Sequence, residues 1–158
     1  MHALTPRPLE WLDHAPVRAS RSRRIGQPPS VVWPAIADHA GWPRWFPRLV
    51  AVEPGPVAEG VGGTRRVDIG LAQVDEEFLA WEPERRFAFT VTGSTRPGVV
   101  SMVEEVRLTP DGEAACTVTY TMGLEPKGGA KVLRPVLEPL LRRNLRDALA
   151  GLAVHVHG

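Results

Sequence analysis

A single amide on an apolar helix face is the feature of this sequence with the clearest chemical meaning. The apolar residues of that face recur at helical spacing and are Leu133, Leu137, Leu140, Leu141, Leu145, Ala148 and Leu152. At about 100° per residue, Asn144 falls inside this stripe. A buried amide that finds no hydrogen-bond partner costs roughly 1–3 kcal/mol. We therefore expect Asn144 either to bond within the core or to face a cavity that holds a polar group.

Two pairs of neighbouring charges, Arg65–Arg66 and Glu76–Glu77, lie in segments whose pattern predicts strands. Because side chains alternate along a strand, only one member of each pair can face the interior. Apolar residues two and four positions further along share the faces of Arg65 and Glu77, so we expect these two side chains to point inward. The alternative is that the charges pair on the outer surface, as most strand charges do.

Glu104 and Tyr120 are the other side chains that could move protons or donate hydrogen bonds. Tyr120 is the only tyrosine and lies on the apolar face of a predicted strand, where a core tyrosine with a bonded hydroxyl is the alternative. A carboxyl group with a tuned pKa acts as a general acid or base, and donors stabilise a developing oxyanion. The leading catalytic candidates are Asn144, Arg65 and Glu77.

Motifs for metals and cofactors are not found in the sequence. His39 is expected to cap the end of a helix, and His155 and His157 diverge if they lie on one helix. The glycines at 60–63 join two predicted strands and open no helix, which excludes a phosphate-binding loop. We therefore expect no metal site and no cofactor.

Turn-forming residues divide the chain into short elements followed by one long helix. Sixteen prolines and fifteen glycines mark the turns, and alternating apolar residues between them predict strands. The expected elements are a strand at 17–25, helices at about 31–38 and 42–46, strands at 64–70, 73–81, 86–92, 99–108 and 116–124, and a helix from the glycines at 128–129 to about 154.

Consecutive hairpin signals predict an antiparallel sheet, and a sheet with one apolar face must cover that face. Only the C-terminal helix is long enough to do so. The predicted fold class is therefore α+β: a curved antiparallel sheet of about seven strands wrapped around a long C-terminal helix, with two short helices between strands 1 and 2. We expect residues 1–15 to form an extension and residues 16–158 to form a single domain, with a cavity beside Asn144.

Composition argues against several classes of partner and location. The chain has 158 residues and a formal net charge of +1, and its basic segment 17–25 lacks the interleaved aromatic residues of a nucleic-acid groove. Cys116 is the only cysteine, which excludes an intrachain disulfide. No signal-like segment and no run of 18 apolar residues is found, so stable membrane insertion is not expected. We expect a cytoplasmic protein that binds no nucleic acid, with a homodimer left open.

Several motifs, in this order and spacing, resemble the START-like (SRPBCC) superfamily, and within it the polyketide cyclase/dehydrase family. They are Pro29-Ser30-Val31-Val32-Trp33, Trp42-Pro43-Arg44-Trp45-Phe46-Pro47, Gly62-Gly63-Thr64-Arg65-Arg66-Val67, Trp81-Glu82-Pro83-Glu84-Arg85-Arg86-Phe87 and Leu141-Arg142-Arg143-Asn144-Leu145. The match spans about residues 17–154. The resemblance implies a helix-grip fold with a deep pocket for an apolar or polycyclic ligand.

The resemblance also implies which residues bind the ligand. Aromatic residues of the second short helix and an asparagine of the last helix matter in the aromatase/cyclases of this family, and Trp42, Phe46 and Asn144 match them. The expected lining residues are Trp42, Trp45, Phe46, Trp81, Phe87, Phe89, Met102, Tyr120, Leu137 and Leu141.

Two positions depart from the aromatase/cyclase pattern. Leu49 stands where those enzymes carry a tyrosine, and Trp81 stands where they carry an arginine. The first hypothesis is therefore a carrier or binder of a hydrophobic small molecule, such as a lipid or a polyketide-like compound. The alternative is a cyclase or dehydratase that closes rings by aldol chemistry, which needs an enolate held near a carbonyl. A protein-interaction module of the same fold is a third reading.

Overall fold

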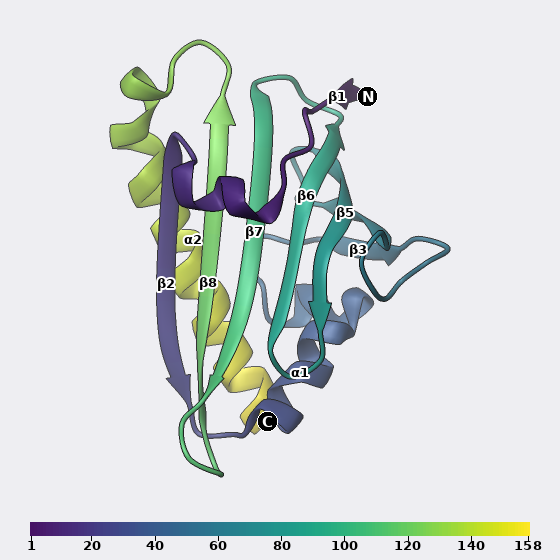
Figure 1. The fold of residues 1–158 in the computed structure, drawn as a ribbon, viewed down its shortest axis with the longest axis vertical. Helices are drawn as coiled ribbons and strands as arrows, with labels where there is room; N and C mark the ends of the chain where they lie inside the picture. The colour runs from purple at the N-terminus through teal and green to yellow at the C-terminus, as the bar shows by residue number, and fades with distance from the viewer.

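The computed structural model describes residues 1–158, apart from the side chains of residues 130 and 131. Its strands form one antiparallel sheet in the order β2-β8-β7-β6-β5-β4-β3, with β1 paired to β6 (Figure 1). The strands are β1 His2–Ala3, β2 Val17–Ile25, β3 Ala51–Pro54, β4 Thr64–Asp68, β5 Gln73–Glu82, β6 Arg86–Ser94, β7 Val99–Pro110 and β8 Cys116–Pro126. The helices are η1 Leu9–His14, α1 Pro29–Ala37, η2 His39–Arg44 and α2 Ala130–His157.

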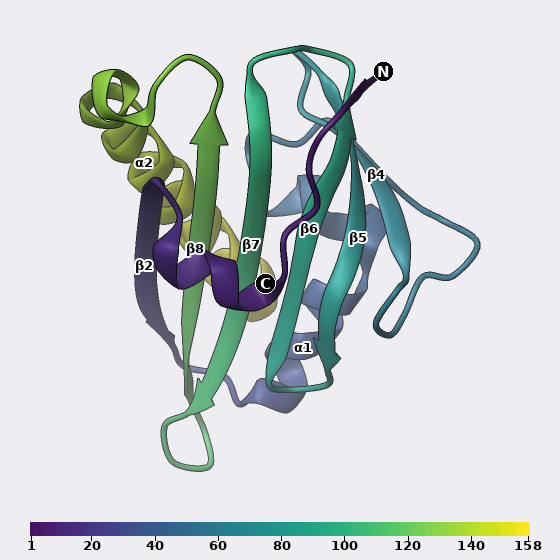
Figure 2. The same cartoon turned by 45° about the horizontal axis from the view of Figure 1, so that its top comes forward.

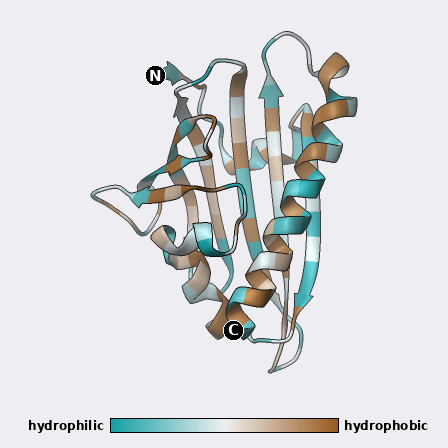
Figure 3. Cartoon of the chain, turned by 180° about the vertical axis from the view of Figure 1, so that it is seen from behind, coloured by the Kyte–Doolittle hydropathy of each residue, from teal (hydrophilic) through white to brown (hydrophobic). Residues whose placement is uncertain are grey.

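The sheet curves around α2, which lies against its inner face alongside β2 and β8 (Figures 1 and 3). The α1 and η2 helices cover the inner face at the end where the C-terminus lies. Between these helices and α2, the core is built from alternate residues of the central strands, such as Phe87, Phe89 and Val91 of β6. The predicted α+β fold, a curved antiparallel sheet that grips a long C-terminal helix, is confirmed.

Two short strands were not predicted from the sequence, and both are too short to show an alternation. β1 has two residues and is held by its register with Gly93 and Ser94 of β6. β3 has four residues, of which only Val52 is buried, and it ends at Pro54. Each strand exists because a neighbouring strand offers free backbone groups, which a local pattern does not reveal.

Residues 1–15 lie across the outer face of the sheet, on the side away from α2 (Figures 1 and 2). The η1 helix buries Leu12 against β8, where a Cβ added to Gly123 would meet Leu12 and Ala15 at 2.8 and 2.7 Å. Arg7 donates to Ser101 and reaches Glu125 at 3.3 Å. The extension is thus packed on the domain.

One glycine of α2 sets how closely the helix approaches the short helices. A Cβ added to Gly151 would overlap the backbone carbonyl of Trp45, whose carbon would lie 3.0 Å away. Trp45 is buried and its backbone follows η2 directly. The absence of a side chain at position 151 therefore lets the last turns of α2 pack on the segment that holds the aromatic residues.

We predict that Gly151→Ala lowers the free energy of unfolding by about 1–3 kcal/mol, because the new methyl group must push α2 away from the Trp45 backbone. A loss of stability would be informative, since alanine normally stabilises a helix interior relative to glycine by about 0.5–1 kcal/mol. Chemical denaturation measures the change. Gly26→Ala is the matched control, because a Cβ there has its nearest contact at 3.5 Å. Unchanged or raised stability of Gly151→Ala would contradict the close approach.

Candidate functional site

A cavity of about 330 Å³ lies between the inner face of the sheet, η2 and the middle of α2. Strands β4 to β8 supply its floor, and Leu140, Leu141 and Asn144 of α2 supply one wall. Most lining side chains are apolar. The polar exceptions are Arg48, Arg65, Glu76, Glu104, Tyr120 and Asn144. The cavity therefore has an apolar body with polar groups at separate places.

A buried ion pair forms part of the cavity floor. Arg65 and Glu76 face one another across β4 and β5, and Arg65 Nε lies 2.5 Å from Glu76 Oε2. The two side chains are 1% and 4% exposed. The Arg65 guanidinium also lies over the ring of Trp42 at 4.1 Å and near Phe89 at 4.9 Å. Pairing and cation–π contacts compensate for the loss of hydration that burial of this charge requires.

Glu104 and Tyr120 form a second buried pair beside the first. They lie on β7 and β8, and the Tyr120 hydroxyl donates to Glu104 Oε1 at 2.7 Å. Burial, and then the negative charge of Glu76, raise the pKa of Glu104 to about 8. Burial also raises the pKa of Tyr120, so its hydroxyl keeps its proton.

The charge balance of this cluster follows from its geometry. The guanidinium of Arg65 is close to two buried carboxyl groups, those of Glu76 and Glu104, and it donates a hydrogen bond directly to Glu76. Burial raises the pKa of Glu76, but the ion pair with Arg65 opposes that rise. Among the side chains that the structure describes, Glu104 has no such ion pair, and it is the carboxyl that keeps a proton at neutral pH. The cluster then consists of one cation, one anion and one uncharged carboxylic acid.

His39 supports Arg65 from the side of η2. Its Nε2 donates to the carbonyl of Ala58 at 2.7 Å, which leaves Nδ1 as an acceptor 3.4 Å from Arg65 Nη1. Burial, and then the charge of Arg65, lower the pKa of His39 to about 4, so the ring is neutral. The expectation that His39 caps a helix is wrong. Its partner Ala58 lies 19 residues away, in a loop that no local signal connects to it.

Asn144 lies at the mouth of the cavity and is half-buried. Its Oδ1 accepts a hydrogen bond of 3.1 Å from Nε of Arg48, so the amide both lines the cavity and has a protein partner. Arg48 was not among the residues selected from the sequence, because it is an exposed arginine in a loop with no pattern around it. Leu49, the position that departs from the aromatase/cyclase pattern, also lines the cavity.

The other residues selected from the sequence divide into those on the cavity wall and those behind it. The wall includes Trp42, Phe46, Arg65, Phe89, Met102, Tyr120 and Leu141. Four expected lining residues lie elsewhere and are corrections: Trp45, Trp81, Phe87 and Leu137.

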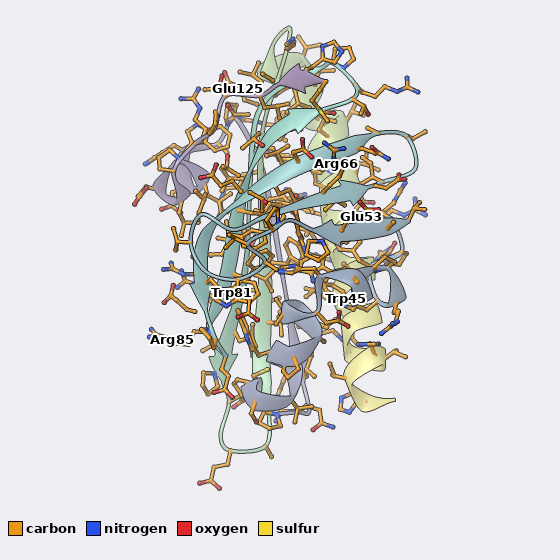
Figure 4. All side chains as sticks on the ribbon, turned by 90° about the vertical axis from the view of Figure 1, so that its right-hand side faces the viewer. Trp45, Glu53, Arg66, Trp81, Arg85 and Glu125 are labelled. Atoms are coloured by element: carbon orange, nitrogen blue, oxygen red, sulfur yellow. The ribbon has the colours of Figure 1, made fainter. Side chains whose placement is uncertain are left out.

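These four residues pack behind or beside the wall. Phe87 is fully buried under Arg65 and Trp42, with ring centroids of Trp42 and Phe87 6.0 Å apart. Trp81 packs on Trp33, with its centroid 5.3 Å away, and Figure 4 shows Trp81 and Trp45 well separated, with Trp45 close to α2. Leu137 is partly buried on α2 against the core. These four side chains therefore belong to the core, because other residues lie between them and the cavity.

The expectation that Glu77 points inward is wrong. Glu77 is exposed, and Glu76 is the buried member of the pair. The reason is an irregularity in β5: Phe78 pairs with Phe89 and Ala80 pairs with Ala88, so Leu79 is an extra residue. It shifts the alternation by one position.

The displaced alternation brings the inward-facing Trp81 onto the same side as Phe78, whose ring stacks on it with centroids 5.7 Å apart. A regular alternation counted back from Trp81 therefore predicts Glu77 as the inward residue, whereas the buried residue is Glu76.

The structure brings together a guanidinium, a carboxylic acid and a phenol at the floor of an apolar cavity. These groups can accept and donate hydrogen bonds to an oxygen atom of a bound molecule, and Glu104 can donate a proton near neutral pH. Among the side chains that the structure describes, no group of three His, Cys, Asp or Glu residues could hold a metal ion. No described helix is long and apolar enough to cross a membrane.

Comparisons with known proteins agree with this architecture. The sequence family described as "Polyketide cyclase / dehydrase and lipid transport" matches residues 16–157. The uncharacterized protein Rv2574 of Mycobacterium tuberculosis is 33% identical over 147 residues, which cover 88% of this chain and 86% of that protein.

Among solved structures, the ZhuI aromatase/cyclase from Streptomyces sp. R1128 has a TM-score of 0.75 at 19% identity, over 89% of this chain and 93% of the other. A START superfamily protein from Mycobacterium smegmatis has a TM-score of 0.68 at 12% identity, over 89% and 97%. At these identities, the structural likenesses show a shared fold.

We predict that the stability of the protein falls relative to that of a Glu104→Gln variant as pH rises from about 4.5 to about 8. The folded state keeps the Glu104 proton over this range, whereas the unfolded state has released it, so each step up in pH favours unfolding. The relative loss should be on the order of 2–5 kcal/mol between pH 5 and 9. Denaturant titrations at a series of pH values measure it.

Glu77→Gln is the control for this prediction, because it removes an exposed carboxylate from the same sheet. It should leave the pH dependence of the wild type in place. Parallel stability curves for the wild type and Glu104→Gln would show that Glu104 is ionised in the folded protein.

Proposed function

The chain belongs to the polyketide cyclase / dehydrase and lipid transport family, and on this premise we propose that it binds a hydrophobic small molecule in the cavity between α2 and the sheet. The bound molecule has an apolar body and an uncharged oxygen group that meets Arg65, Glu104 and Tyr120. Carrier or sensor proteins of lipids and secondary metabolites need no more than this.

The observation that carries the proposal is the cavity itself. Its volume of about 330 Å³ lies within the range of small-molecule sites, roughly 300–1,000 Å³. Apolar walls with a few convergent polar groups are typical of such sites, because the walls supply affinity and the polar groups orient the ligand. Trp42, Phe89 and Met102 form such walls here.

The charge balance at the floor supports an uncharged oxygen group over a carboxylate. The Arg65 charge is already neutralised by Glu76 at 2.5 Å. A ligand carboxylate at the floor would add a second anion beside Glu76 and next to Glu104, and the described lining cation that has no carboxylate partner, Arg48, lies at the mouth beside Asn144. A carbonyl, hydroxyl or phenol carries no such cost and can bond with Glu104 and Tyr120.

We predict that 1-naphthol binds more tightly than naphthalene by about two- to tenfold at pH 7, since a net hydrogen bond between uncharged groups contributes about 0.5–1.5 kcal/mol, and more tightly than 1-naphthoate, whose charge must be desolvated. Leu140→Trp should weaken 1-naphthol binding by at least tenfold, because Leu140 lines the mouth and is partly exposed, so a larger ring fits there without unfolding the core. Calorimetry or fluorescence titration measures both effects.

Val154→Trp is the matched control, since Val154 is 73% exposed on the same helix and does not line the cavity. It should leave binding unchanged. Absence of binding of all three probes, or equal weakening by both tryptophan variants, would overturn the proposal. Tighter binding of 1-naphthoate would overturn the charge argument alone.

A second candidate is a cyclase or dehydratase, and the raised pKa of Glu104 favours it. In an aldol ring closure, the double-bond electrons of an enol form a bond to a carbonyl carbon, the acceptor oxygen takes up a proton, and the enol hydroxyl gives up its proton as it becomes a carbonyl, so no net proton is consumed. Glu104 can donate that proton, and Arg65 can stabilise the developing oxyanion. Asn144 would orient the chain at the mouth. The fold likeness to the ZhuI aromatase/cyclase supports this alternative as well.

For this alternative, we predict dehydration of a probe β-hydroxyketone, 4-hydroxy-4-phenylbutan-2-one, to its conjugated enone, followed by absorbance. Glu104→Gln should lower the rate constant by about 10²–10⁴-fold while 1-naphthol binding stays within a few-fold of wild type. Glu77→Gln, on the outer face, should leave the rate unchanged. A rate no greater than that in buffer leaves the binder as the function, since a carrier has no turnover to lose.

A further inference from the structure

Large apolar side chains are exposed together around the mouth of the cavity. We call them the apolar rim: Val50, Ile69, Leu71, Val132, Val136 and Leu140. Leu71 is 77% exposed and Val136 is 67% exposed. Single exposed apolar residues are ordinary on a protein surface, but a group of them around an opening indicates an interaction surface.

The apolar rim has two sides that face each other across the opening. One side is the turn between β4 and β5, where Ile69 and Leu71 line the cavity and Val50 packs beside Gly70. The other side is the first half of α2, where Val136 precedes the cavity-lining Leu140 by one helical turn. Figure 3 shows this side of the molecule, with apolar segments on the first turns of α2 and on β3 and β4. A partner that covers the rim therefore also covers the mouth.

Arginine side chains surround the rim. Arg96 donates to the backbone carbonyl of Leu71 at 3.0 Å, Arg48 donates to Asn144 at the mouth, and Arg143 is exposed on α2 beside it. Among the described side chains, none of these three arginines has a carboxylate within 4.0 Å.

Two acidic residues near this end are already engaged with other cations. Asp75 pairs with Arg66 at 2.7 Å, and Glu138 pairs with Arg134 at 3.6 Å. Asp68, at the end of β4, accepts a hydrogen bond from the backbone N–H of Gly70 and has no cation within 4.0 Å among the described side chains. The three arginines outnumber this carboxylate, so the end of the molecule around the mouth is basic, although the whole chain has a net charge of only +1.

We propose that the apolar rim and the three arginines dock on the surface of an anionic lipid bilayer. The arginines would meet lipid phosphates while Leu71 and Val136 enter the boundary between head groups and acyl chains. This proposal rests on the proposed function, because it assumes that the cavity binds an apolar ligand. Such a ligand, dissolved in the bilayer, would enter the cavity without passing through water. Charge complementarity favours this partner over a second copy of the chain, because a symmetric dimer across the rim would place like-charged arginines together.

Vesicle flotation with the full-length protein tests the proposal. The protein should float with phosphatidylcholine vesicles that contain about a third phosphatidylglycerol, and at least about tenfold less with pure phosphatidylcholine. Leu71→Ser combined with Val136→Ser should weaken binding to the anionic vesicles by about tenfold or more. Arg96→Gln combined with Arg143→Gln should weaken it by a similar factor and reduce its dependence on salt.

Two matched controls lie away from the mouth. Val61→Ser removes a valine that is 74% exposed in the loop between β3 and β4, and Arg85→Gln removes an exposed arginine from the turn between β5 and β6. Both should bind vesicles like the wild type. Binding of 1-naphthol by the combined Arg96→Gln and Arg143→Gln variant should stay unchanged, because neither side chain lines the cavity, and this separates the docking surface from the cavity.

Three outcomes would overturn the proposal. They are absence of flotation with anionic vesicles, flotation that the rim and control variants weaken equally, and a concentration-dependent dimer that the Leu71 and Val136 substitutions dissociate without any vesicle binding. If 1-naphthol still binds in those cases, only the docking inference fails. If 1-naphthol binding fails while flotation behaves as expected, only the cavity function fails.

Discussion

The buried guanidinium of Arg65 is the interaction on which the candidate site depends. A cation removed from water needs an anion, hydrogen-bond acceptors or aromatic faces around it, and the fold supplies all three. Glu76 pairs with it, His39 offers a ring nitrogen, and Trp42 and Phe89 lie against its plane. These neighbours come from three elements, β5, η2 and β6, so all three must be in place around β4 before the charge can be buried.

The properties of the remaining polar groups follow from this one charge. Glu76 takes the ion pair, and Glu104 is left with a phenol as its partner, so Glu104 is the carboxyl that keeps its proton. His39 stays neutral because it lies beside a cation in a buried place. An apolar cavity with an uncharged acid at its floor is the result. Fold likeness alone would not reveal this, since proteins that share a fold differ in the chemistry of their sites.

The shape of the cavity depends on close approaches elsewhere. Gly151 lets the end of α2 pack on the backbone of Trp45, and the first half of the helix leaves Val132, Val136 and Leu140 exposed. The extra residue at Leu79 turns both Phe78 and Trp81 toward the aromatic layer beneath Arg65. The protein is thus closed by tight packing at one end and open at the other. Arg48, Arg96 and Arg143, which have no carboxylate partner among the described side chains, lie at the open end.

The sequence by itself determined the antiparallel sheet, the long C-terminal helix and the inward face of Arg65, because alternation and helical spacing are local and regular there. It also located Asn144, Trp42 and Tyr120 on the surfaces that meet at the cavity. Only the tertiary structure decided which glutamate is buried, because one extra residue in β5 reverses the alternation that a sequence count assumes.

The protonation of Glu104 and the tautomer of His39 likewise depend on groups that are distant in the sequence. The net charge of the chain, which is near zero, does not reveal that one end of the molecule is basic. Charges and pKa values are set by distances in space, whereas a sequence pattern reports only neighbours along the chain.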